Sequence, residues 1–303
     1  EYWKDNEDVK VITLYLESFA NPKEFLKIAK EITPKKPVIA IKAAKTASGQ
    51  KAASSHTGAL ASADSVASTI LEQSGVIRVD TVEDMFDLAK AFDKANLPNG
   101  NRLGILTNAG GPAILTADEA DKYGRVLPAL EPKTVNALKK FAPEEASFNN
   151  PVDLLPPATS EMYKEATEIM LKDKNIDSLI IILGPPLMFD TLEIAKAISE
   201  GTKTSGKTSL IVLMSQDENI PKLTKAAPSH PPVFNSAESA ARCIGQMHKY
   251  KLFLEKESGR FIDFKVNKNK VKKILNSQKK KGEFYLNFDE VCEILEAYGL
   301  PII

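Results

Sequence analysis

The chain has 303 residues, a length that predicts about two domains of ordinary size. Its 40 Lys and Arg residues balance its 40 Asp and Glu residues, and this neutrality argues against a general nucleic-acid binder, which carries a basic excess. Hydrophobic residues make up 43% and charged residues 26%, as in a folded globular protein, and no apolar run approaches the roughly 18 residues of a membrane helix. With two cysteines and three histidines we expect no disulfide framework and no metal site, and we expect a location in the reducing cytoplasm.

The first 97 residues alternate apolar, β-rich runs with amphipathic helical segments, which indicates a parallel α/β sheet. We expect strands at residues 10–16, 37–42 and 76–79 and helices at about 22–31, 63–73 and 82–93. Residues 12–32 overlay without gaps on residues 178–198, a strand and helix further along the chain. This overlay favours strands three to five of a doubly wound domain that lacks its first two strands; a chance similarity between two amphipathic units is the alternative. The strand at 10–16 would then be an open edge for a second copy or another segment to cover.

Residues 98–252 show the same alternation in a longer series. Strands are expected at 102–107, 125–127, 178–184, 209–214 and 232–234, with helices at about 113–122, 132–141, 190–200 and from 236 onward. Five strands with helical crossovers predict a flavodoxin-like doubly wound domain. Residues 253–303 differ, because a lysine-rich linker leads to a helix over 287–298 that Asn287 or Asp289 caps. The predicted fold is therefore α/β, with two flavodoxin-like parallel-sheet domains at 1–97 and 98–252, the first incomplete, and a helical segment at 253–303.

The segment from Lys45 to Leu60 follows the strand at 37–42 and consists mainly of small residues around one imidazole, that of His56. Its length and composition predict an irregular loop at the carboxyl end of a parallel strand, where doubly wound sheets bind ligands. A functional loop and a flexible surface loop with an incidental histidine are the two interpretations. Glu17 follows the neighbouring strand, so it either orients a ring nitrogen of His56 as a nucleophile or is an ordinary solvated acid.

A second candidate is the turn Thr107-Asn108-Ala109-Gly110-Gly111-Pro112, between a strand and a helix. Its two glycines let the backbone approach a ligand closely, and the N–H groups of a helix N-terminus favour an anion such as phosphate. The turn matches neither the phosphate loop of nucleoside triphosphatases nor the dinucleotide-binding fingerprint. An ordinary tight turn is the alternative.

Five motifs, in order, resemble the nucleoside-diphosphate-forming acyl-CoA synthetases, which include ADP-forming acetyl-CoA synthetases and the α subunit of succinyl-CoA synthetase. They are Tyr15-Leu16-Glu17-Ser18, Pro37-Val38-Ile39-Ala40-Ile41-Lys42, Ser55-His56-Thr57-Gly58-Ala59-Leu60, the turn from Thr107 to Pro112, and Asn150-Pro151-Val152-Asp153-Leu154. The similarity covers nearly all of residues 1–250, and residues 288–301 resemble the opening of the family's ATP-grasp portion.

The resemblance implies an ADP-forming acid–CoA ligase of the acetate type. Such a ligase converts acyl-CoA, nucleoside diphosphate and phosphate into acid, CoA and nucleoside triphosphate, through an acyl phosphate and a phosphohistidine. The implied site residues are the catalytic His56 and Glu17, the phosphate-binding Asn108, Ala109, Gly110 and Gly111, the mobile-loop Ser55, Thr57 and Gly58, and the substrate-side Asn150 and Asp153. The motifs do not select among acetate, branched-chain and aryl acids, or between ADP and GDP.

The resemblance also implies partners for this chain. The family's CoA-binding domain would precede residue 1, and its ATP-grasp body would follow residue 303. We therefore expect coenzyme A, ATP or ADP, and Mg²⁺ to be bound mainly by segments outside this chain, in the same protein or in another subunit. We further expect an oligomer, no membrane or nucleic-acid partner, and no activity from the chain alone.

Two other classes of function stay open at this point. Some relatives of the family are regulatory parts of protein acyltransferases, which bind a ligand and do no ligation. A plain flavodoxin-like interaction module would make the Ser-His-Thr-Gly match a coincidence. The presence of His56 favours the ligase, since a pure sensor does not need it.

Overall fold

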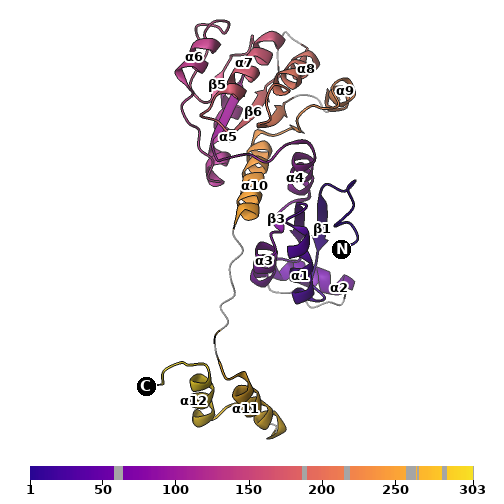
Figure 1. The fold of residues 1–303 in the computed structure, drawn as a ribbon. Coiled ribbons are helices and arrows are strands. Elements are labelled where there is room, and N and C mark those ends of the chain that lie inside the picture. Colours follow the sequence, from indigo (N-terminus) through magenta and orange to yellow (C-terminus); the bar gives the residue numbers. More distant parts are fainter. Residues whose placement is uncertain are drawn as a thin grey trace. The chain divides into compact units, whose positions relative to one another are not determined.

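The computed structural model describes residues 1–57, 64–185, 190–214, 219–256, 264, 266–281 and 285–302. The chain divides into two compact units, Glu1–Lys256 and Glu257–Ile303; Figure 1 labels their helices and several of their strands. In these described ranges, no helix combines the length and the apolar character needed to cross a membrane.

A three-stranded parallel sheet, in the order β1-β2-β3, forms the first part of the larger unit. Its elements are β1 (Ile12–Leu16), α1 (Pro22–Ile32), β2 (Val38–Lys42), α2 (Ala47–Thr57), α3 (Asp64–Gln73), β3 (Ile77–Val79) and α4 (Val82–Lys94). The three strands expected from the sequence are confirmed. Leu16 pairs with Lys42, so β1 and β2 end side by side.

A five-stranded parallel sheet follows, in the order β5-β4-β6-β7-β8. Its elements are β4 (Leu103–Thr107), α5 (Gly110–Lys122), α6 (Pro132–Leu138), β5 (Val152–Asp153), α7 (Ser160–Lys172), β6 (Ser178–Leu183), α8 (Thr191–Thr202), β7 (Thr208–Leu213), α9 (Asn219–Ala226), β8 (Val233–Phe234) and α10 (Ala237–Glu255). In sequence order along the sheet this is 2-1-3-4-5, the flavodoxin-like arrangement. The predicted fold class is therefore confirmed.

The second strand of this sheet is not where the sequence pattern placed it. We expected it at residues 125–127, but Val126 forms a single parallel bridge, to Arg102, and the strand that pairs with the end of β4 is β5. Pro128 has no N–H to continue a ladder, so the chain leaves the sheet edge after Leu127 and returns to it only at β5.

The expected irregular loop over residues 45–60 is also corrected, because Ala47–Thr57 forms helix α2. Alanine-rich sequence favours a helix, and the Thr46 hydroxyl accepts a hydrogen bond from the Gly49 N–H at 3.1 Å, as an N-cap side chain does. Gly58 lies outside the described residues, and of Ser55, His56 and Thr57 the helical backbone alone is described. The sequence pattern also did not predict α7 and α9.

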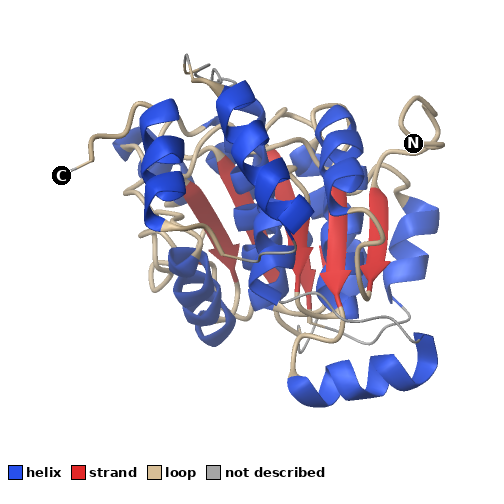
Figure 2. Cartoon of the chain, turned by 90° about the horizontal axis from the view of Figure 1, so that it is seen from below, coloured by secondary structure: helices blue, strands red, loops and turns tan. Residues whose placement is uncertain are grey.

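One continuous apolar core joins the two sheets through α4 and α10. It contains residues from both sheets and both helices, among them Ile39, Ile41, Leu88, Ile105, Ile180 and Ile244. The opposite face of the first sheet packs against α1 and α3, and the opposite face of the second packs against α7 and α8, so helices lie on both faces of the strands (Figure 2). A buried hydrogen bond of 2.6 Å from the Tyr250 hydroxyl in α10 to the Thr33 carbonyl adds a polar link to the end of α1, which packs on the first sheet.

The smaller unit contains α11 (Lys268–Lys281) and α12 (Phe288–Ala297). The helix expected over 287–298 is confirmed, and Asn287 is its cap. The Asn287 side chain accepts a hydrogen bond from the Glu290 N–H at 2.9 Å, and the Glu290 carboxylate accepts one from the Asn287 N–H at 3.0 Å. This reciprocal pair is a capping box.

Ala44, between β2 and α2, has a φ angle of 56°, in the left-handed region that favours glycine. We expect Ala44→Gly to raise the free energy of unfolding by about 0.5–1 kcal/mol, since relief of the strain exceeds the entropy that glycine adds to the unfolded chain. Urea unfolding measures this. The matched control is Ala52→Gly in exposed α2, which should lower stability by about 1 kcal/mol; equal losses for both variants would contradict the prediction.

Candidate active site

The carboxyl ends of β1, β2 and β3 bring charged side chains to one edge of the first sheet. Glu17 lies half-buried on the bend after β1, and the Ala43 N–H donates to the Leu16 carbonyl at 2.8 Å, which fixes the end of β2 beside it. Lys42, the last residue of β2, is fully buried, and its ammonium donates to the Ala43 carbonyl. Burial lowers the pKa of Lys42, and the carboxylates of Asp64 and Glu17 oppose that shift.

Two ion pairs anchor the segment that carries His56 to a single strand. Before the segment, Lys45 pairs with Asp80, directly after β3, and this hydrogen bond lowers the pKa of the Asp80 carboxyl. After it, Asp64 at the start of α3 accepts two hydrogen bonds from the Arg78 guanidinium, at 2.8 and 3.0 Å. Arg78 also donates to the Ser68 hydroxyl one turn further along α3. Lys45 and Asp64, which flank residues 46–63, are therefore tied to the end of β3 and to the residue just after it.

The carboxyl edge of the second sheet presents mainly backbone groups, together with one carboxylate, that of Asp153. The Asn108 side chain is buried and accepts from the Gly184 N–H at 2.8 Å, which ties the turn after β4 to the end of β6. Ala109 is the N-cap of α5, so no side-chain cap accepts hydrogen bonds from the N–H groups of the first turn. That turn also contains no acidic residue. A Cβ at Gly111 would meet no atom within 4 Å, so the backbone there is open to close approach. This N-terminus suits an anion.

Of the two residues predicted to lie on the substrate side, the structure brings Asp153 to this turn and uses Asn150 elsewhere. A Cβ on Gly110 would lie 3.5 Å from Asp153 Oδ2, while the other carboxylate oxygen of Asp153 accepts from the Leu155 N–H at 2.9 Å. The Asn150 amide lies against β4 in the gap left by the chain's departure after residue 127. It donates to the Leu103 carbonyl at 2.8 Å and accepts from the Ile105 N–H at 3.0 Å, in place of a strand backbone.

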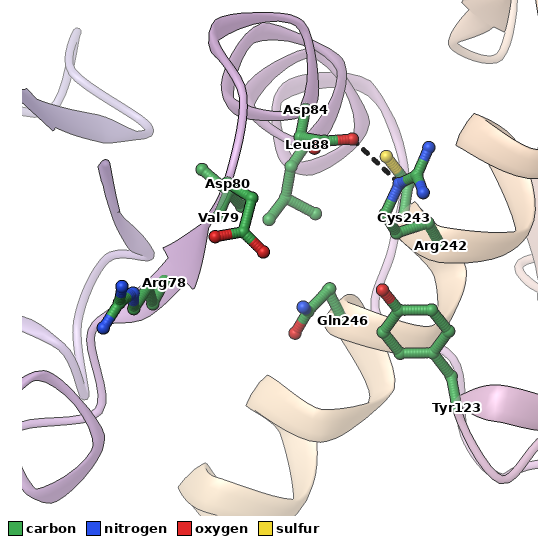
Figure 3. A pocket seen from close by; sticks show the side chains of 9 residues that line it. All are labelled: Arg78, Val79, Asp80, Asp84, Leu88, Tyr123, Arg242, Cys243 and Gln246. Atoms are coloured by element: carbon green, nitrogen blue, oxygen red, sulfur yellow. Dashed lines mark ion pairs between the residues drawn. The ribbon is translucent and has the colours of Figure 1, made fainter. Parts of the chain in front are cut away.

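A small cleft opens where the two sheets meet, next to the anchors of the histidine segment (Figure 3). It is lined by side chains from β3, α4, α5 and α10, namely Arg78, Asp80, Asp84, Tyr123, Arg242 and Gln246 with apolar neighbours. Arg242 of α10 pairs with Asp84 of α4 at 2.8 Å and with Glu119 of α5 at 3.1 Å. One guanidinium thus links helices that pack on different sheets.

The other two histidines lie away from these edges. His230 is buried, its Nδ1 donates to the Pro231 carbonyl at 2.6 Å, and its Nε2 lies 3.0 Å from the Thr224 hydroxyl and 3.1 Å from the Lys94 ammonium. Burial lowers the pKa of both His230 and His248. No three His, Cys, Asp or Glu side chains converge as a metal site in the described part of the chain.

Sequence reasoning identified Glu17 but missed Lys42, Asp64, Arg78 and Asp80. Lys42 and Arg78 were detectable, because each interrupts an apolar strand with a long charged side chain. Their partners were not, since Asp64 and Asp80 become neighbours of the histidine segment through strand pairing and helix packing.

We expect Arg78→Met to lower the free energy of unfolding by about 1–2 kcal/mol, because it removes charge-assisted hydrogen bonds to Asp64 and leaves that carboxylate unpaired. Lys35→Met is the control. It breaks an exposed pair with Asp5, which should change stability by less than about 0.5 kcal/mol. Equal effects of the two substitutions in urea unfolding would show that the Arg78 pair does not anchor α3.

The chain is similar in sequence and in fold to proteins of known function. A succinyl-CoA ligase like flavodoxin domain matches residues 1–92, and a ligase-CoA domain matches residues 103–231. The ADP-forming 4-hydroxybutyrate–CoA ligase of Nitrosopumilus maritimus is 36% identical over 98% of this chain and 43% of its own length. The α subunit of ADP-forming acetate–CoA ligase II of Pyrococcus furiosus is 42% identical over 71% of this chain and 48% of its own length.

A solved structure is also similar, that of the dinucleotide forming acetyl-coenzyme A synthetase 1 of Ca. Korarchaeum cryptofilum in complex with phosphate and ADP. It matches with a TM-score of 0.76 and 28% identity, over 84% of this chain and 56% of that one. This chain spans about half the length of these relatives. With both domain matches and the parallel sheets in agreement, the chain belongs to the succinyl-CoA ligase-like family of ADP-forming acyl-CoA ligases.

Proposed function

We propose that this chain is the phosphohistidine-bearing part of an ADP-forming acid–CoA ligase. One observation carries the proposal: the strand that leads into the segment with His56 is paired in register with the strand that ends at Leu16, directly before Glu17. Because parallel strands end at the same edge, the acid and the histidine segment lie on one side of the sheet. The relatives named above supply the reaction class.

The reaction proceeds in three displacements. An oxygen of inorganic phosphate attacks the acyl carbon of acyl-CoA, and the CoA thiolate leaves, which produces an acyl phosphate. A ring nitrogen of His56 attacks the phosphorus, and the free carboxylate leaves. The phosphohistidine passes its phosphoryl group to the terminal phosphate of ADP, which forms ATP and restores the imidazole. Glu17 accepts a hydrogen bond from the other ring nitrogen and stabilises the cationic ring that forms during transfer.

The N-terminus of α5 is the proposed phosphate site of this chain. Its first turn contains no acid, its cap side chain makes no hydrogen bond there, and Gly111 leaves the backbone open. Backbone N–H groups and the helix dipole stabilise a phosphate dianion in such a position. Asn108 holds the turn in place through its bond to Gly184.

We assign CoA, the nucleotide and Mg²⁺ to segments outside this chain. Within the described ranges, no group of three carboxylate, imidazole or thiol side chains converges, so these residues offer no protein-only magnesium site and no step is assigned to the metal. The two family matches end at residue 92 and begin at residue 103. We accordingly propose domains at 1–97 and 98–252, followed by a linker and the start of an ATP-grasp region at 253–303. A short-chain acid, with acetate as the first candidate, is the proposed substrate.

We expect the intact protein that carries this chain to acquire acid-labile, base-stable label from [γ-³²P]ATP, and we expect His56→Asn to abolish the label. His230→Asn and His248→Asn should retain it, because both ring nitrogens of His230 are already engaged and neither residue lies at the two strand edges. Label that persists in His56→Asn and disappears in either control would refute the assignment.

Glu17→Gln should leave the fold intact and reduce phosphoryl transfer about ten- to a hundredfold, since a charge-assisted hydrogen bond contributes roughly 1.5–3 kcal/mol. Single-turnover labelling measures the rate, and thermal unfolding checks the fold. An unchanged labelling rate would make Glu17 an ordinary solvated acid.

A further inference from the structure

The C-terminal end of α4 meets the second sheet at a buried histidine. His230, which lies before the edge strand β8, is 4% exposed. Its Nε2 lies 3.1 Å from the ammonium of Lys94, the last residue of α4, and 3.0 Å from the hydroxyl of Thr224 in α9. Its Nδ1 lies 2.6 Å from the carbonyl oxygen of Pro231. These contacts join α4, the helix that follows β3 of the first sheet, to the edge of the second sheet.

The contacts fix the protonation state of the imidazole. A carbonyl oxygen only accepts hydrogen bonds, so Nδ1 must carry a proton to bond Pro231. An ammonium only donates, so Nε2 must be without a proton to bond Lys94. The ring of His230 is therefore neutral in this structure, with its proton on Nδ1. A second proton, on Nε2, would direct one cation at another.

Thr224 offers the protonated ring a different partner. Its hydroxyl lies 3.0 Å from the Ile220 carbonyl, one turn earlier in α9, and donates its single proton there. The Thr224 oxygen can then accept a hydrogen bond from a protonated Nε2, at the present separation of 3.0 Å. Protonation of His230 would thus exchange one hydrogen bond at Nε2 for another and expel the Lys94 ammonium. The two arrangements differ in whether the end of α4 is held.

No carboxylate beside the joint neutralises the ammonium. In the described part of the chain Lys94 has no ion pair. The charged side chains that line the cavity at the joint come from α4 alone in these described ranges, namely Glu83, Asp87, Lys90 and Lys94. Asp87 is paired with Lys90 at 2.8 Å, and Glu83 lies in the first turn of α4, at the opposite end of the helix from Lys94. The elements α9, β8 and α10 contribute uncharged side chains to this cavity.

We propose that this joint is a pH-sensitive latch, in which the Lys94 ammonium and a proton compete for Nε2 of His230. While the ring is neutral, the end of α4 is bonded to the second sheet. Once the ring is protonated, Lys94 is released and Nε2 donates to Thr224 instead. Because α4 is one of the two helices whose side chains join both sheets in a single core, the latch weakens the junction between the sheets in acid.

The direction of the pH dependence follows from the surroundings of the ring. Burial lowers the pKa of His230, the hydrogen bond to Pro231 raises it, and the charge of Lys94 lowers it, with a net shift below the ordinary value of 6.5. The unfolded chain takes up the proton near that ordinary value. The latch therefore contributes its full stability above about pH 6.5, and it loses this contribution as the pH falls towards the lower pKa of the folded protein.

Long-range proton–nitrogen NMR spectra of the whole chain test the competition. The signals of His56 and His248 are identified by their loss in His56→Asn and His248→Asn, and the remaining ring is His230. We expect its proton on Nδ1 in mildly alkaline solution and a pKa below about 6.5. Lys94→Met should raise the pKa of His230, because the competing cation is gone.

The matched control for Lys94→Met is Lys10→Met. This substitution also removes an ammonium beside the end of α4, but one that is paired with the Asp93 carboxylate at 3.0 Å. It should leave the pKa of His230 unchanged.

Urea unfolding over a range of pH measures the latch itself. His230→Gln keeps a side-chain acceptor for Lys94 and does not titrate. Below about pH 6.5, each further pH unit of acidification should raise the unfolding equilibrium constant of the wild type, relative to His230→Gln, by up to about tenfold, until the folded ring is protonated as well. Hydrogen exchange at the C-terminal end of α4 should rise over the same pH range in the wild type and not in the variant.

Three results would overturn the latch. They are a proton on Nε2 in mildly alkaline solution, a pKa of His230 that does not respond to Lys94→Met, and parallel profiles of stability against pH for the wild type and His230→Gln. If His230→Gln does not fold, the first two results still decide, because they leave the imidazole in place. None of these measurements involves phosphorylation of His56, so they stand apart from the test of the proposed function.

Discussion

Burial of α10 between two parallel sheets is the constraint on which the rest of the structure depends. This helix contributes to the one core that reaches both sheets, together with α4. Two glycines permit the close packing. A Cβ at Gly245 would lie 2.4 Å from the Cβ of Tyr123 at the end of α5, and a Cβ at Gly75, whose φ is +73°, would lie 2.2 Å from the Phe253 ring. Because Arg242 and Tyr250 add polar links on the same helix, the two sheets cannot shift relative to each other without breaking both apolar and ionic contacts.

With the sheets fixed, the carboxyl edges of the two sheets present different kinds of group. The first edge uses side-chain charges: the ion pairs of Arg78 and Lys45 hold the residues that flank the histidine segment, and the buried Lys42 ends β2. The second edge uses backbone N–H groups at the start of α5, which an uncharged, open glycine turn leaves accessible. Charged side chains suit a step in which an imidazole gains and loses positive charge, whereas backbone donors suit an anion that arrives and departs unchanged.

A buried charge and a strained backbone angle, both unfavourable for stability, lie close together at the end of β2. Lys42 is a buried charge at the end of β2, and Ala44, in the connection from β2 to α2, is a non-glycine residue with a positive φ. Elsewhere, buried polar groups serve the fold directly. Asn150, for example, supplies side-chain hydrogen bonds to β4 where the neighbouring strand is missing. Both features lie at the edge from which the chain enters the segment that contains His56.

The sequence by itself determined the fold class, most of the strands and helices, and the motif positions His56, Glu17 and Asn108–Gly111, because hydrophobic periodicity and glycine-containing turns are local signals. It did not locate β5, since Pro128 ends one candidate strand and a distant segment pairs in its place. Nor did it predict helix α2. That stretch consists of small residues typical of a loop, but its alanines and the cap from Thr46 favour a helix. Tertiary structure alone decided that Arg78 meets Asp64 and that Lys42 is buried. These contacts join residues from different strands and helices, and no local pattern encodes which of them pairing and packing bring together.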